Sequence, residues 1–265
     1  MHAVGYVFIG GEPIAQREAV IGIVEQVLRT LDVEPRELWC RKANGQPVRD
    51  KAFTWDRFLE AVDSMSYADG YGIKRSKAPF YLNVSLRHGA KAFAPMKYEP
   101  PQLSMRVETG ERVPVERAIA AGELLLRQAA TSLPVISGGL TCFESEDAAS
   151  SEVLFVGMAP ADAPEQVRLR KSIDQLSVKQ FWRKARRVYW QTLLGPHITS
   201  KLGGAAAARA AGADSVEEIG GSILVHAGGP FEPDDAPSFR ARTAGLRAWL
   251  WKYSIQNPVD NPELP

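Results

Sequence analysis

Histidines and glycine pairs are the residues of this 265-residue chain whose chemistry could support catalysis or anion binding. The histidines are His2, His88, His197 and His226, and they are too far apart to show a paired metal-ligand spacing. We therefore expect no zinc site. His197 follows a Gly-Pro turn, and His226 ends the apolar run 223–225. These positions predict that His197 is a turn residue and that His226 is hydrogen-bonded at the end of a strand, rather than that either is catalytic.

Glycine pairs offer a second kind of chemistry, because backbone N–H groups in glycine-rich turns can converge on an anion. Most of the pairs stand at the edge of a strand-like or helix-like run, where glycine also ends elements and adopts positive φ. The sequence favours this structural interpretation. A small-molecule enzyme with a glycine-lined anion pocket, using His197 or His226, is the alternative function. The pairs are Gly10-Gly11, Gly138-Gly139, Gly203-Gly204, Gly220-Gly221 and Gly228-Gly229.

Linear signatures of common enzyme classes are absent from the sequence. There is no Gly-x-Ser-x-Gly elbow, no GxxxxGK[ST] phosphate loop and no HExxH motif. Gly70-Tyr71-Gly72 lacks the third glycine of a dinucleotide fingerprint. The sequence therefore offers no linear motif for catalytic residues, for a bound metal or for a cofactor, and we expect none of the three.

One segment of the chain is both basic and aromatic. Residues 165–190 interleave arginine and lysine with Trp182, Tyr189 and Trp190, a composition that occurs in nucleic-acid-binding proteins. The aromatic residues also recur at about heptad spacing, which favours a solvated helix face whose aromatic side packs inward. Nucleic-acid binding through Arg183, Arg186 and Arg187 stays a third reading, and we expect no nucleic-acid partner.

Acidic residues gather in three clusters. Their carboxylates could bind Mg²⁺ or Ca²⁺, form loop surface and helix caps, or dock a basic protein, since matched charge speeds association. The clusters are Glu144, Glu146, Asp147 and Glu152; Glu217 and Glu218; and Glu232, Asp234 and Asp235.

Bulk composition is that of an ordinary globular protein. The net charge is +1 and 45% of the residues are hydrophobic, so overall charge favours neither nucleic acid nor an anionic membrane. We expect no signal peptide and no membrane-spanning segment or membrane partner. Cys40 and Cys142 are expected to be buried free thiols in a reducing cytoplasm. The length favours one domain over 1–265, with 1–135 as a candidate N-terminal subdomain.

Periodicity predicts an α+β fold with a largely antiparallel sheet packed with amphipathic helices. Alternation around 80–86 and 103–107 indicates strands with one wet face. Asn44-Gly45 predicts a hairpin turn, and Thr54 an N-cap. Further strands are expected at 4–9, 38–40, 140–143, 153–158 and 222–226. Helices are expected from Pro13 to Leu31, 54–65, from Pro114 to Ala129, 165–194, 205–211 and from Asp234 onward.

Two segments carry further structural expectations. Residues 67–79 are rich in glycine and basic residues and predict a loop. Trp190, Leu194, Ile198 and Leu202 are spaced by four, which predicts consecutive helical turns with a kink at Gly195-Pro196.

The C-terminal half resembles the immunity protein 52 family of bacterial polymorphic-toxin systems, and more distantly the type VI immunity proteins. The resemblance is carried over about 185–255 by WQTLLGP from Trp190, LGG from Leu202, IGGSILV from Ile219, PFEPDD from Pro230 and LRAWL from Leu246.

This resemblance implies a binder and not an enzyme, one that pairs with a cognate toxin, often a restriction-endonuclease-like nuclease, and the absence of enzyme motifs agrees with it. A nuclease presents a positive surface to DNA phosphates. The expected toxin-binding residues are therefore acidic: first Glu144, Glu146 and Asp147, and second Glu217 and Glu218. A small-molecule enzyme is the alternative.

Overall fold

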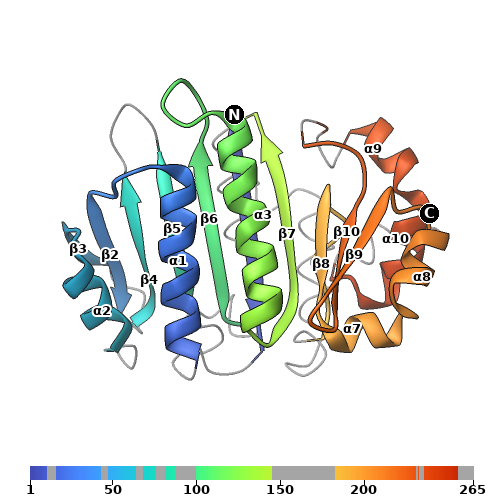
Figure 1. The fold of residues 1–265 in the computed structure, drawn as a ribbon, viewed down its shortest axis with the longest axis horizontal. Helices are drawn as coiled ribbons and strands as arrows, with labels where there is room; N and C mark the ends of the chain where they lie inside the picture. The colour runs from blue at the N-terminus through green and yellow to red at the C-terminus, as the bar shows by residue number, and fades with distance from the viewer. Residues whose placement is uncertain are drawn as a thin grey trace, which may run out of the picture.

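Strand-forming segments along the whole chain join one antiparallel 10-stranded sheet in the computed structural model, which describes residues 1–10, 16–42, 47–63, 68–75, 81–87, 100–144, 183–230, 232 and 236–255. The strand order is β3-β2-β4-β5-β6-β1-β7-β8-β10-β9 (Figure 1). The predicted α+β class with an antiparallel sheet is confirmed. The strands are β1 (His2–Ile9), β2 (Glu37–Lys42), β3 (Pro47–Ala52), β4 (Ala68–Arg75), β5 (Leu82–Arg87), β6 (Gln102–Glu108), β7 (Val135–Phe143), β8 (Gln191–Leu194), β9 (Ser215–Ile219) and β10 (Ser222–His226).

Helices cover opposite faces at the two ends of this sheet (Figure 1). Side chains alternate along β10, so Leu224 joins the core under α1 and α3, whereas Ile223 and Val225 join a second core under the C-terminal helices. The helices are α1 (Arg17–Leu31), α2 (Trp55–Asp63), α3 (Val115–Ser132), α7 (Pro196–Lys201), α8 (Gly204–Ala210), α9 (Pro237–Arg242) and α10 (Ala244–Leu250), followed by the 3₁₀ helix η3 (Trp251–Tyr253).

Local signals predicted several boundaries correctly. The β2–β3 hairpin is present, with Cys40 opposite Val48. The Arg57 N–H donates to Thr54 Oγ1 at 3.3 Å, which confirms Thr54 as an N-cap of α2. Both cysteines are free thiols, with Cys142 buried and Cys40 partly buried. Pro13, at the predicted start of the first helix, lies outside the described residues, and so does the predicted strand 153–158.

The predicted loop at 67–79 is wrong, because Ala68–Arg75 is strand β4 between β2 and β5. Gly72, one of the glycines on which the loop prediction rested, marks a close approach inside the sheet. A Cβ there would lie 2.7 Å from Trp39 Nε1 and 2.6 Å from the Val84 carbonyl oxygen. The Trp39 indole N–H donates to Asn83 Oδ1 at 3.0 Å, so the indole occupies the space that a side chain at 72 would need.

The alternation in β5 and β6 predicted the antiparallel pairing correctly but not a wet face. Ser85 and Ser104 are 2% and 1% exposed, and their hydroxyl oxygens lie 3.0 Å apart. Arg106, two residues along β6, is also buried. Both faces of these central strands are therefore largely buried. The two serine hydroxyls share a hydrogen bond, and the Arg106 guanidinium carbon lies 3.8 Å from the Tyr81 ring centroid.

The predicted helix over 165–194 is wrong where the structure describes it. Residues 183–190 are not helical and 191–194 form β8, while 165–182 lie outside the described residues. The spacing of four arises because a strand, Gly195 and α7 follow one another. Trp190 packs in the core under α1 and α3, and Leu194 and Ile198 pack in the second core. The Gly195 N–H donates to the Ile136 carbonyl at 2.9 Å, which ties this corner to β7.

The last helix is also shorter than predicted, because α9 ends at Arg242 and α10 begins at Ala244. Asp234 and Asp235 lie outside the described residues, and Ala236 is the N-cap residue of α9. Residues 205–211 and 222–226 behave as predicted, forming α8 and β10.

Candidate functional site

A half-buried polar cluster lies between α3 and the strands β8, β10 and β9. Gln191 Nε2 donates to Glu123 Oε1 at 2.6 Å, and Arg127 forms an ion pair with Glu217. His226 lies beside these pairs at the end of β10. The cluster therefore combines residues from α3, from β8 and from the β9–β10 hairpin, and α3 is distant from the three strands in the sequence.

Backbone geometry explains why these side chains meet. Gln191 is opposite His226 in the β8–β10 register, and Ser215 is opposite His226 in the β10–β9 register. Glu217 is two residues beyond Ser215, so it shares the same sheet face. Glu123 and Arg127 are four residues apart on α3 and therefore point to this face together.

Burial controls the protonation of His226. Loss of contact with water lowers the pKa of the His226 imidazole, which is the largest influence, and Arg127 lowers that pKa further. Glu123, Glu217 and Asp214 act in the opposite direction without overcoming burial. The imidazole is therefore neutral at pH 7. Protonating it in the folded protein would place a positive charge in a partly buried site, which costs stability.

This shift predicts a pH-dependent stability. The folded protein has the lower histidine pKa, so the stabilisation is complete above the unfolded value of about 6.5 and is lost as pH falls through the folded value. We expect His226→Gln to flatten the decline in the free energy of unfolding between about pH 7 and pH 5. Urea unfolding at several pH values measures this. His197→Gln, at an exposed position, is the matched control, and an unchanged slope in His226→Gln would contradict the prediction.

The backbone around His226 is held by Asp214. The Asp214 N–H donates to the His226 carbonyl at 2.9 Å, and the Asp214 carboxylate accepts the Gly228 N–H at 2.6 Å. The Ala227 N–H donates to the Trp190 carbonyl at 2.9 Å. The end of β10 is therefore a fixed corner of the sheet.

The acidic residues predicted for docking have different surroundings. Glu144 is exposed directly after β7, and Glu218 is exposed on β9, an edge strand of the sheet. Glu217 is partly buried in its ion pair with Arg127, so its carboxylate already has a partner. The structure does not describe Glu146, Asp147 or Glu152.

Glu144 directly follows β7, which is three spacings or about 14 Å from β9, and Glu218 is level with Ser137 in the strand register, seven residues or about 23 Å from Glu144 along the strand. The two residues are therefore about 27 Å apart along the sheet, which is close to the full width of a standard interface of roughly 800 Å² per partner. Glu232, in the third acidic cluster, forms an ion pair with Arg242 at 3.4 Å. Among the described residues, no group of three or more His, Cys, Asp or Glu side chains is arranged to hold a metal ion.

The glycine pairs mostly serve the backbone, as the structural interpretation predicts. Gly220 and Gly221 form the β9–β10 turn with φ values of 56° and 85°. Gly203, with φ 84°, is the N-cap residue of α8. Gly138-Gly139 is different, because it lies within β7, where the Tyr189 ring packs on Gly139. His197 is exposed in the first turn of α7.

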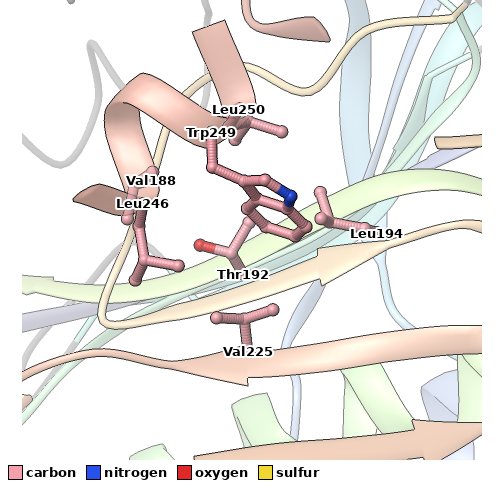
Figure 2. Close-up of a pocket in the computed structure, with 7 residues that line it drawn as sticks. All are labelled: Val188, Thr192, Leu194, Val225, Leu246, Trp249 and Leu250. Atoms are coloured by element: carbon pink, nitrogen blue, oxygen red, sulfur yellow. The ribbon is translucent and has the colours of Figure 1, made fainter. Parts of the chain in front are cut away.

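A narrow crevice separates α10 from the sheet (Figure 2). The space inside it is about 10 Å³, at the lower limit for one water molecule. The Trp249 indole N–H donates to the Leu202 carbonyl at 3.0 Å and closes one side. The described residues of three segments that carry the resemblance, WQTLLGP, IGGSILV and LRAWL, contribute to this crevice or to the two cores, so these segments form a scaffold. The lining residues are Val188, Thr192, Leu194, Val225, Leu246, Trp249 and Leu250.

Sequence reasoning singled out His226 and Glu217 but missed Glu123, Arg127 and Gln191. The Glu123/Arg127 spacing of four on a predicted helix was a usable signal for an ordered charged face. Gln191 had no such signal, because it was placed in a predicted helix and is the first residue of β8.

The fold defines an α+β protein built on a 10-stranded antiparallel sheet. Over 96% of its length the chain is similar in fold to the T6SS protein PA0821 of Pseudomonas aeruginosa, with a TM-score of 0.57, 16% sequence identity and coverage of 73% of that chain. No protein-family model and no curated protein matches the sequence. Within the described part of the chain, no helix is long and apolar enough to cross a membrane.

Proposed function

We propose that this chain is an immunity protein that binds and neutralises a cognate secreted toxin, a nuclease, by stoichiometric protein–protein binding in the cytoplasm. The observation that carries the proposal is the fold likeness to a T6SS protein over 96% of the chain. The fold likeness suggests a role in a type VI secretion system, and the motifs of the C-terminal half resemble those of immunity proteins. Immunity to a toxin delivered by such a system is the function that agrees with both observations. The protein acts by binding, with no catalysis of its own.

Surface charge supports a nuclease as the partner. A nuclease must attract DNA phosphates, so the surface around its active site is positive. Glu144 and Glu218 offer exposed carboxylates on or beside rigid strands of the sheet. Fixed opposite charge of this kind speeds association and selects the partner. We keep Glu144, Glu146, Asp147 and Glu218 as docking candidates, with Glu217 acting through its ion pair to Arg127.

Co-expression with the product of the neighbouring toxin gene tests the function. We expect this protein to restore growth of cells that express the toxin in their cytoplasm, and the purified pair to co-elute at a 1:1 ratio. Nuclease activity should fall in proportion to added protein until the toxin is titrated. A toxin that keeps full activity in the presence of excess protein would refute the proposal.

A further inference from the structure

An exposed tryptophan lies at the start of α2, at the edge of the sheet farthest from the C-terminal helices (Figure 1). Trp55 is 38% exposed, and in the described part of the chain Met1 is the other exposed large hydrophobic residue. Met1 is terminal, whereas Trp55 lies in helix α2, which packs on β2 and β4 near the β3 edge of the sheet. Large aromatic side chains left in water at fixed positions are typical centres of protein interfaces.

Neighbouring rings hold Trp55 in place. Its ring packs edge-on against Phe53, with centroids 5.3 Å apart, and against Phe58, with centroids 5.7 Å apart. Phe58 is buried and packs against Tyr71 of β4 at 5.7 Å. This ladder connects the exposed indole to the core. Trp55 can therefore enter a partner's pocket with little further loss of side-chain entropy.

Acidic side chains stand next to the indole on the outer surface of α2. Asp56 and Glu60 are exposed and four residues apart, so they form one stripe beside Trp55 and the half-buried Leu59. Arg57 keeps its positive charge but directs its Nη1 to the Ala52 carbonyl at 3.0 Å, at the end of β3, so Asp56, Arg57 and Glu60 together leave this surface with a net charge of −1. The surface thus combines an aromatic face with two carboxylates.

We propose that this α2 surface, formed by Trp55, Asp56, Leu59 and Glu60, docks a basic segment of the toxin. A cation above the indole would be held by the ring and by the adjacent carboxylates, and an arginine would use both interactions at once. The proposal rests on the proposed immunity function and identifies the surface through which the protein would bind its toxin.

The position of this surface separates it from the β9 edge. The strands β3 and β9 are the two edges of the sheet, nine spacings or about 43 Å apart, and β4, on which α2 packs, is seven spacings or about 34 Å from β9. A standard interface of about 800 Å² per partner is roughly 30 Å across. One such interface cannot include both Trp55 and Glu218. Glu144 follows β7, six spacings or about 29 Å from β3, so it could lie at the rim.

Binding kinetics with the purified, catalytically inactivated product of the neighbouring toxin gene test the surface. We expect Trp55→Ala to weaken binding by about 30-fold or more, mainly through faster dissociation, and Trp55→Phe to restore much of the affinity. The charge reversals Asp56→Lys and Glu60→Lys together should slow association by about tenfold and reduce its dependence on salt. The reversals Glu18→Lys and Glu25→Lys, at exposed positions of α1, make the same change in net charge and should leave binding within about twofold.

Each outcome separates this proposal from the proposed function. If the unsubstituted protein binds and the α2 variants bind equally well, the surface is wrong and the immunity function stands. If Glu144→Lys with Glu218→Lys abolishes binding while the α2 variants do not, docking belongs to the acidic end of the sheet. If the unsubstituted protein does not bind, both proposals fail. Self-association that Trp55→Ala removes would assign the surface to a second copy of the chain and overturn the proposal. Urea unfolding of each variant confirms that it is folded.

Discussion

Replacing Gly195 by alanine is expected to lower the free energy of unfolding by about 3 kcal/mol, a large fraction of the stability of an ordinary domain. A Cβ at this position would overlap the carbonyl oxygen of Val135 and lie 2.8 Å from that of Ile136. Both obstacles are backbone atoms, so no side-chain rotation can relieve the overlap. The chain would have to move away from β7.

Movement at Gly195 would break more than one contact. The Gly195 N–H donates to Ile136, and its carbonyl accepts the Thr199 N–H at 3.0 Å in the first turn of α7. The Thr199 hydroxyl donates to the Leu194 carbonyl at 2.9 Å. Displacing this corner therefore loosens the end of β8 and the start of α7 together.

Gly22→Ala is the matched control, because it makes the same substitution where the structure has room. No heavy atom lies within 4 Å of a Cβ at Gly22. The position is inside α1, so alanine should stabilise the protein by about 0.5–1 kcal/mol. Urea unfolding of both variants measures the difference. A Gly195→Ala protein as stable as the parent would show that the β7–β8 corner is not tightly packed.

Helices and strands whose secondary structure is determined by their own hydrophobic pattern were predictable from the sequence. The apolar run of β1, the helical spacing of α3 and the apolar run of β10 each match the structure closely. The failures at β4 and β8 share a different cause. Gly72 is required by the Trp39 indole on a neighbouring strand, and 191–194 became a strand because β7 and β10 pair with it. Neither contact is visible in the local pattern.

The candidate site was predictable only in parts. His226 and Glu217 stood out as a histidine and an acidic residue, but their proximity depends on the β9–β10 hairpin packing beside α3. Glu123 and Gln191 enter the same cluster through α3 and β8, and their 2.6 Å hydrogen bond joins residues 68 positions apart. Composition identifies candidate side chains, whereas strand order decides which of them meet.

Arg186 gives the second large effect, because it is a buried arginine in a segment whose composition suggested an exposed basic face. It is 1% exposed. Its guanidinium carbon lies 4.2 Å from the Tyr6 ring centroid and 4.8 Å from that of Phe8. Its Nη2 donates to Gln102 Oε1 at 3.2 Å, and its carbonyl accepts the Ser254 hydroxyl at 2.9 Å. The side chain therefore joins 183–190 to β1 and β6.

We expect Arg186→Ala to lower the free energy of unfolding by about 3 kcal/mol, because it removes buried packing, two cation–π contacts and a hydrogen bond to buried Gln102. Arg186→Lys should recover only part of the loss. A planar guanidinium can stack on the Tyr6 and Phe8 rings while an N–H at its edge donates to Gln102, whereas a lysine ammonium group cannot make both kinds of contact in this geometry. Arg183→Ala, at an exposed position, should stay within about 0.5 kcal/mol of the parent. Urea unfolding of the three variants provides the comparison, and equal effects of Arg183→Ala and Arg186→Ala would contradict it.

This difference decides how nucleic-acid binding through the basic segment can be tested. Arg187 is half-buried with its guanidinium carbon 5.1 Å from the Tyr189 ring centroid, so of the three arginines first considered, Arg183 alone is exposed. Replacing all three would destabilise the protein through Arg186, so a loss of DNA retention would not distinguish loss of folding from loss of phosphate contacts. Arg183→Ala alone keeps the fold and removes one potential phosphate contact, which should reduce the salt slope of binding by about 1 if the contact exists. We expect no salt-dependent retention of the parent on DNA, and hence no effect of Arg183→Ala. A retained parent whose slope falls in the variant would instead establish the basic segment as a DNA-binding surface.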